Sequence, residues 1–341
     1  MTREWVARHG VAVAVGALCV IAAVFVPGFL TLGNLTTILL HVSVNAILAL
    51  GMTFVIVTGG IDLSVGSLVG LGGVLAATTL TSTGVLGAVG VGGATALAIL
   101  AATGTGAAVG VLNGGVTAYL RIAPFVVTLA TMTIARGVAR LVTGGVPVGF
   151  PPFDDPAFAA KTAALDALHA VGGGRIPLPG FERGFPVPAL AMLALVALGA
   201  FVLGRTRFGR YVYATGGNAE AARLSGVPVR RVTLWAYAIS GACAGVAAVL
   251  VTGQLRSGGP DAGTLYELNA IAAAVIGGAS LLGGVGTAWG ALMGALVIGV
   301  LNNALDLLGV QAFWQEIAKG VIILLAVCFD VWTKRGTRSH A

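Results

Sequence analysis

The segment from Gly59 to Ser67 (GGIDLSVGS) joins an acid, two hydroxyl side chains and several glycines between two long apolar stretches. A carboxylate such as that of Asp62 and a hydroxyl such as that of Ser64 bind polar solutes through hydrogen bonds. Irregular backbone and a lone acid at membrane depth are tolerated only inside a helix bundle or beside a wet cavity. The pattern indicates a transport site, and it fits equally a tight turn in which Asp62 caps a helix.

Further polar side chains lie within or beside the apolar stretches. Such groups fit a role in transport, and they fit interhelical hydrogen bonding equally well. For Asn45, local helix capping is a further explanation. Arg136 and Arg140 share one helical face, from which they contact a solute or a partner, or extend toward lipid headgroups. Asn113 falls at the expected end of an apolar stretch and is interpreted as a helix cap. The candidate residues of a solute pathway are Asn45, Asp62, Ser64, Thr128, Arg136, Asn269 and Asn302.

Catalytic chemistry finds no support in the sequence. A phosphate-binding loop needs Gly-Lys followed by Ser or Thr, whereas the three lysines, at 161, 319 and 334, follow Ala, Ala and Thr. The three cysteines lie apart in apolar stretches, and the four histidines form no ligand cluster. The sequence therefore predicts a chain that is not an enzyme, holds no metal and does not hydrolyse ATP itself.

Composition places the elements that hold these groups in a membrane. The chain of 341 residues is 57% hydrophobic and 9% charged, with mean hydropathy +0.99, whereas soluble domains carry roughly 25% charged residues. Apolar stretches of about 18 residues or more recur along it, each long enough to cross a bilayer. We expect an all-α polytopic membrane protein, with one transmembrane domain over residues 1–341. The ten expected spans are about 11–30, 35–58, 64–80, 85–112, 123–143, 187–204, 233–253, 266–283, 287–306 and 313–330.

Basic residues assign a side of the membrane to each connection, because they accumulate in cytoplasmic loops. Ten spans with a cytoplasmic N-terminus put twelve basic residues on the inner side and four on the outer side. We therefore expect both termini in the cytoplasm, a Pro-rich outer loop at about 144–186 and an arginine-rich inner loop at about 205–232. The short stretch 64–80 is either a full crossing or a re-entrant half-helix.

Each of the two loops contains a predicted helix. In the outer loop, the amphipathic segment 157–170 is expected to lie on the membrane surface or to meet a partner. In the inner loop, Asn218 is a good N-cap, residues 220–224 suit a short helix, and Gly226 with Pro228 suits its end. The inner helix is either a plain connector or a docking element for another subunit.

Four long motifs follow one another along roughly residues 30–330. They lie at 45–67, including GMTFVIVTGGIDLSVGS, at 123–137, at 206–226 and at 267–287. Together they resemble the permease subunits of bacterial ABC monosaccharide importers, the family of ribose, xylose and galactofuranose permeases. Residues 217–226 and 313–320 are similar to the ribose and xylose type, whereas the outer segment 172–177 is similar to the galactofuranose type. The resemblance therefore leaves the sugar open.

The resemblance implies a half-pore in the bacterial inner membrane that works with other chains. Two permease chains form the pore in the lipid, cytosolic ATPases use ATP and Mg²⁺, and a periplasmic or lipid-anchored sugar-binding protein delivers the monosaccharide. This chain then binds no cofactor and no nucleic acid. The inner-loop helix is implied to couple to the ATPase as a compact knob. The implied coupling residues are Gly217, Asn218, Glu220, Ala221, Ala222, Arg223, Ser225 and Gly226.

The alternative function is an ion-coupled secondary transporter or channel for a small polar solute, which composition alone allows. Such a chain needs intramembrane acids for ion coupling, and Asp62, Asp306 and Glu316 are available. The arginine-rich docking loop favours the ATP-driven importer.

Overall fold

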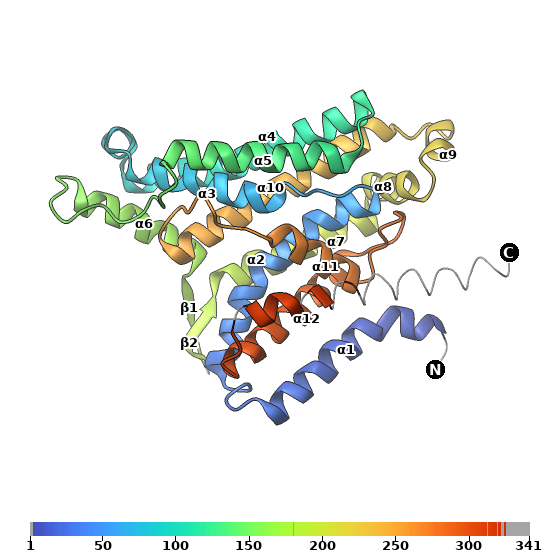
Figure 1. Ribbon diagram of the computed structural model, residues 1–341, viewed down its shortest axis with the longest axis horizontal. Coiled ribbons are helices and arrows are strands. Elements are labelled where there is room, and N and C mark those ends of the chain that lie inside the picture. The colour runs from blue at the N-terminus through green and yellow to red at the C-terminus, as the bar shows by residue number, and fades with distance from the viewer. Residues whose placement is uncertain (1–2, 180, 312, 319, 322–323, 325–341) are drawn as a thin grey trace.

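The computed structural model describes residues 3–179, 181–311, 313–318, 320–321 and 324. The regular secondary structure of this part of the chain is helical apart from one antiparallel hairpin, formed by β1 (Arg175–Leu178) and β2 (Phe181–Pro186). The helices form an elongated bundle (Figure 1). Helix α6 and the hairpin lie toward one end, which we call the α6 end, and α8 and α9 lie at the other, the α9 end.

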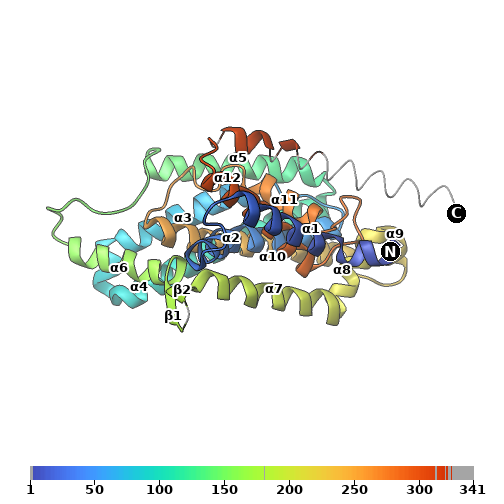
Figure 2. The same ribbon diagram turned by 90° about the horizontal axis from the view of Figure 1, so that it is seen from below.

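Most helices run along the long axis of the bundle, with α5 and α7 on opposite faces in Figure 2 and α10 between them. The start of α1 lies toward the α9 end (Figure 1). The helices are α1 (Arg3–Phe25), α2 (Leu32–Val57), α3 (Val65–Thr81), α4 (Thr83–Leu120), α5 (Pro124–Thr143), α6 (Phe158–Gly172), α7 (Val187–Arg205), α8 (Arg207–Gly217), α9 (Ala219–Leu224), α10 (Val229–Leu255), α11 (Tyr266–Ile276) and α12 (Ala288–Leu307).

Six helices within the described residues are long and apolar enough to cross a bilayer, namely α2, α4, α5, α7, α10 and α12. Shorter apolar helices are Val11–Phe25, α3 and α11. The expected class of helical, multi-span protein is confirmed, and the number of ten spans stays a prediction. Half of the last expected span, 313–330, lies outside the described residues.

Burial separates central helices from peripheral ones. The most apolar 18-residue window of α2 is 83% buried, whereas that of α4 is only 28% buried. Leu100 on α4, Leu141 on α5 and Phe201 on α7 are all more than half exposed. Such large apolar surfaces are stable where lipid covers them. The bundle therefore has a packed centre around α2 and α10 and a lipid-compatible periphery.

Small residues let α4 and α10 approach closely. A Cβ at Gly106 would overlap the Gly241 carbonyl oxygen, and a Cβ at Gly241 would overlap that of Gly106. In the absence of a hydrophobic driving force between helices in lipid, such close backbone packing is a main source of association. The high glycine content of the sequence thus serves helix packing as well as turns.

Two irregular segments interrupt the bundle. In the first break, residues 58–64, the chain leaves α2 through Gly59, whose φ is +85°, and α3 begins only at Val65. In the second break, residues 277–287, α11 ends at Ile276, short of the expected limit of 283. Gly278 has φ +90°, a left-handed conformation that suits glycine and ends a helix.

The predicted amphipathic helix of the outer loop is confirmed as α6. Its apolar side chains Leu165 and Leu168 are fully buried, and a Cβ at Gly172 would lie 2.5 Å from the Leu250 carbonyl oxygen of α10. The apolar face of α6 is therefore covered within the chain itself.

Candidate transport site and coupling arm

The first break is held by a buried carboxylate. Asp62 is fully buried. Its Oδ1 accepts hydrogen bonds from the Ser64 backbone N–H (3.0 Å) and hydroxyl (2.6 Å), and its Oδ2 accepts one from the Ser240 hydroxyl of α10 (2.8 Å). A buried carboxyl group is tolerated when hydrogen bonds replace its hydration, as they do here.

The network extends from Ser64 to two further helices. Asn113 on α4 donates from Nδ2 to the Ser64 hydroxyl (3.0 Å), and Thr131 on α5 donates to Asn113 Oδ1 (2.6 Å). The interpretation of Asn113 as a helix cap is wrong, because α4 continues to Leu120 and the side chain bridges helices instead.

The backbone of the first break is also bound directly. The Ile61 carbonyl oxygen accepts hydrogen bonds from the hydroxyls of Thr128 (3.3 Å) and Tyr237 (3.2 Å). Asp62, Ser64 and Thr128 are thus fully buried and bound within the protein, as in the tight-turn interpretation. Sequence reasoning missed Ser240 and Tyr237, for which the only signal is a polar group inside an apolar span.

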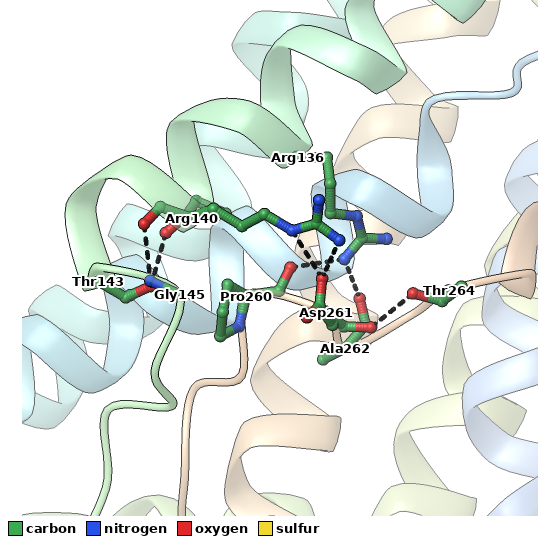
Figure 3. A network of polar contacts seen from close by, with 9 residues as sticks. Arg136, Arg140, Thr143, Gly145, Pro260, Asp261, Ala262 and Thr264 are labelled. Carbon is green, nitrogen blue, oxygen red and sulfur yellow. Dashed lines mark hydrogen bonds and ion pairs between the residues drawn. The ribbon is translucent and has the colours of Figure 1, made fainter.

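Arg136 and Arg140 both reach the loop between α10 and α11 (Figure 3). The Nη1 atom of Arg136 donates to the backbone oxygens of Pro260 (2.6 Å) and Ala262 (2.8 Å). Arg140 donates from Nε (2.9 Å) and Nη2 (2.7 Å) to Asp261 Oδ1. The two arginines lie on the same face of α5, as predicted, and their side chains hold the α10–α11 loop of the same chain. The Arg136 guanidinium is therefore bound to backbone, and its role in a pathway stays a prediction.

A cavity of about 1010 Å³ opens between the start of α2, the end of α10, α11 and the end of α12. It brings together three candidates that are far apart in the sequence, Asn45, Asn269 and Asn302. Most of its other polar side chains are neutral. They are Thr31, Asn34, Thr36, Thr37, Gln254, Tyr266, Asn303 and Gln315, beside His41 and the single acid Asp306.

Amide groups dominate the hydrogen bonding of the cavity wall. Asn34 and Asn303 form a reciprocal pair, with Nδ2–Oδ1 distances of 2.9 and 2.7 Å, which joins the start of α2 to the end of α12. Among the described residues, Asn302 Oδ1 and Gln254 Nε2 are buried and have no hydrogen-bond partner. The exposed amide and hydroxyl groups of the wall are suited to a ligand rich in hydroxyl groups, since each hydroxyl both donates and accepts.

At the α9 end, the chain forms an arm of two helices, α8 and α9. The predicted N-cap is confirmed, because Asn218 Oδ1 accepts from the N–H groups of Glu220 (3.1 Å) and Ala221 (3.0 Å). The predicted stop at Gly226 is confirmed as well, with φ +83°. Sequence reasoning missed α8, although Thr206 is a capping residue whose hydroxyl accepts from the Gly209 N–H (3.1 Å).

Almost all predicted coupling residues are exposed on this arm; only Ala222 is buried. The Arg223 guanidinium donates from Nε to Glu220 Oε2 (3.1 Å), which holds the pKa of Glu220 below its usual value. Leu224, at the end of α9, is 75% exposed. The arm thus presents a rigid, mixed polar and apolar tip to its surroundings.

The family model described as "Branched-chain amino acid transport system / permease component" matches residues 34–327. The ribose import permease protein RbsC of Escherichia coli (strain K12) is 42% identical over 331 residues, which cover 96% of this chain and 95% of that protein. The chain belongs to the ABC monosaccharide permease family. The permease is also 41% identical over 313 residues to RbsC of Bacillus subtilis (strain 168), covering 92% of the chain and 89% of that protein.

The xylose transport system permease protein XylH of Escherichia coli (strain K12) is 36% identical to the permease over an alignment of 362 residues, covering 90% of the chain and 87% of that protein. No solved structure matches the permease. Its relatives are transmembrane components of transporters, so the permease is a multi-pass inner-membrane protein and not an enzyme.

Proposed function

We propose that the permease translocates a pentose, with ribose as the first sugar to test, through the cavity at the α6 end. The observation that carries the proposal is the wall of that cavity, in which amides and hydroxyls from α2, α10, α11 and α12 surround about 1010 Å³. Neutral hydrogen-bonding groups match an uncharged sugar, and the ribose and xylose names of the relatives agree with this chemistry. Asn45, Asn269 and Asn302 are the proposed sugar contacts.

The α9 end is proposed to face the cytoplasm. The six arginines of residues 205–231 gather there, and the start of α1 lies at the same end, in agreement with the positive-inside rule. The cavity then opens toward the periplasm, where a sugar-binding protein releases its ligand. The exposed loop with Arg140 and Asp261 also lies on that side and is available for contact.

Energy for transport is proposed to come from a separate ATPase that binds ATP and Mg²⁺ and docks on α9. The capped, exposed helix is the rigid knob that such docking requires. A second permease chain is proposed to complete the pore.

The proposal is tested by uptake of labelled ribose, xylose, arabinose, galactose, galactofuranose sources and inositol in cells with and without this gene. We expect ribose uptake that is lost on ATP depletion and survives collapse of the ion gradient. Uptake with the opposite energy dependence overturns the importer and supports the alternative, an ion-coupled secondary transporter.

Substitutions test the cavity and the arm separately. Asn302→Leu is expected to lower the uptake rate about tenfold, because one lost hydrogen bond and one blocked contact are worth roughly 1–2 kcal/mol. Thr133→Val, on an exposed part of α5, is the control. Glu220→Lys or Gly226→Asp is expected to uncouple ATP hydrolysis from uptake while the permease stays in the membrane. Wild-type uptake by both arm variants removes the coupling assignment.

A further inference from the structure

At the α9 end, the end of α8 touches the end of α2 and the second break through backbone alone. A Cβ at Gly216 would overlap the Val57 carbonyl oxygen and would lie 2.5 Å from the Gly284 nitrogen. The Gly284 N–H itself donates to the Val57 carbonyl oxygen (2.9 Å). Three chain segments that are far apart in the sequence therefore meet without an intervening side chain.

The second break is shaped to make this contact. Gly283 and Gly284 have φ +86° and +76°, and a Cβ at Gly283 would lie 2.7 Å from the Gly216 carbonyl oxygen. The turn closes on itself, because the Gly283 N–H donates to the Ser280 carbonyl oxygen (2.8 Å). A residue with a side chain at either glycine would be strained and would hold the segments apart.

One side chain adds a directional link. The Tyr213 hydroxyl, on the α8 face toward the second break, donates to the Gly286 carbonyl oxygen (2.7 Å). This bond joins the arm to Gly286, which precedes Thr287, the N-cap of α12. Gly216 joins the arm to Val57, the last residue of α2. Two of the helices so reached, α2 and α12, line the proposed sugar cavity, and the second break connects α12 to α11, which lines it as well.

We propose that this contact, which we call the glycine clamp (Tyr213, Gly216, Val57 and residues 283–286), transmits displacement of the ATPase-docked arm to the cavity wall. Direct backbone contact leaves no side chain to rearrange, so a shift of α8 moves the end of α2 and the second break together. The inference rests on the proposed function. Tyr213 and Gly216 are positioning residues in it and touch no substrate.

The variants to test the clamp are Tyr213→Phe, which removes only the hydroxyl, and Gly216→Ala, which inserts a methyl group between α8 and Val57. The controls are Tyr211→Phe, whose hydroxyl makes no hydrogen bond among the described residues, and Gly204→Ala, at an exposed site with no heavy atom within 4 Å of the added carbon. If Gly216→Ala fails to assemble, Tyr213→Phe carries the test, because it leaves the ring in place.

Two readouts are measured on the full transporter in proteoliposomes, with permease, ATPase and sugar-binding protein. One is the number of sugar molecules imported per ATP hydrolysed. The other is the change in fluorescence on addition of Mg-ATP, from a fluorophore attached at Leu282→Cys. Leu282 lies in the turn of the second break and is 68% exposed, so the label is accessible. The native cysteines are replaced by serine so that only this position is labelled.

We expect Tyr213→Phe to keep the ATPase bound, to lower the sugar-to-ATP ratio about fivefold and to reduce the fluorophore response, since one hydrogen bond of the link is lost. Gly216→Ala is expected to do more. Equal ratios and responses in variants and controls overturn the clamp. A third outcome separates the clamp from the proposed substrate. If the wild-type permease imports none of the sugars but its fluorophore responds to Mg-ATP, and Tyr213→Phe reduces that response, the clamp is supported and only the choice of substrate is overturned.

Discussion

The two breaks of the bundle are both rich in glycine, yet they are held in different ways. The first break is fixed by side chains, with Asp62 at the centre of hydrogen bonds that reach α4, α5 and α10. The second break is fixed mainly by main-chain contacts and by glycines with positive φ, with the Tyr213 hydroxyl of α8 bound to its Gly286 carbonyl oxygen, and its Leu282 and Val285 are exposed. A shared composition therefore builds two different mechanical elements.

The difference follows from the number of groups that must be displaced to move each break. Moving Asp62 would separate a buried carboxyl group from three hydrogen bonds at once, which is costly in a low-dielectric interior. Moving the second break rearranges a turn in which the side chains of Leu282 and Val285 are exposed. The first break is thus suited to anchor α3, and the second to carry motion.

The largest effect is expected at the anchor. Asp62→Ala leaves the Ser64 and Ser240 hydroxyls without their acceptor and should lower the free energy of unfolding by roughly 2–6 kcal/mol, about 1–3 kcal/mol for each unsatisfied hydroxyl. Thermal unfolding in detergent and the amount of permease in the membrane measure this. Asp62→Asn keeps the shape and should lose less. A wild-type melting temperature for Asp62→Ala would show that the two breaks do not differ as described.

A smaller effect is expected where the second break packs against α12. A Cβ at Gly290 would overlap the Gly277 carbonyl oxygen, so Gly290→Ala should cost about 1–3 kcal/mol through overpacking. The matched control is Gly104→Ala, at an exposed helical site with open space, where the better helix propensity of Ala should stabilise slightly. Equal melting temperatures for the two variants would contradict close packing at this break.

Local signals were sufficient to predict the first break, the Asn218 cap and the shared face of Arg136 and Arg140. Each depends on residues close together in the sequence. The acceptor role of Asp62 toward Ser240 was not predictable, because 178 positions separate the two and many hydroxyls lie in apolar spans. The end of α11 was missed for another reason, since repeated glycines in an apolar stretch mark both packing faces and helix ends.

The cavity shows the same limit. Asn45, Asn269 and Asn302 were selected one by one as polar groups in apolar surroundings, and only the fold brings them to one wall. Gln254 and Tyr266 were missed because each sits at a helix end, where a polar residue is ordinary. Sequence thus predicts which groups need an explanation, and packing decides which of them meet.

The two arginines that bind the loop between α10 and α11 should differ in effect. Arg136→Ala leaves the Pro260 and Ala262 carbonyl oxygens unpaired in a partly buried site, at a cost of about 1–3 kcal/mol. Arg140→Ala removes an ion pair whose partners are 59% and 61% exposed, at a cost of about 0–1 kcal/mol that salt lowers further. Denaturant or thermal unfolding at low and high salt separates the two. A larger loss for Arg140→Ala would overturn the assignment of Arg136 as the residue that fixes the loop.

The smallest effect is expected from pH at the arm, outside both breaks. Hydrogen bonding and charge attraction from Arg223 hold the pKa of Glu220 below its usual value, so the carboxylate is ionised throughout neutral pH. A depressed pKa contributes stability above the unfolded-state value, about 4.3 for Glu, and this stability is lost as pH falls through the folded-state value. Titration of the Glu220–Arg223 pair should therefore leave binding of the ATPase to the permease unchanged between about pH 6 and 8.

This binding is measured by pull-down of the two subunits across that pH range, with Glu220→Gln as the comparison. The contradicting result is a loss of binding near pH 6 that is absent in Glu220→Gln. It would show that the pKa of Glu220 is not held below its usual value by Arg223. The arm would then lack the Glu220–Arg223 pair that makes it a rigid docking element for the clamp.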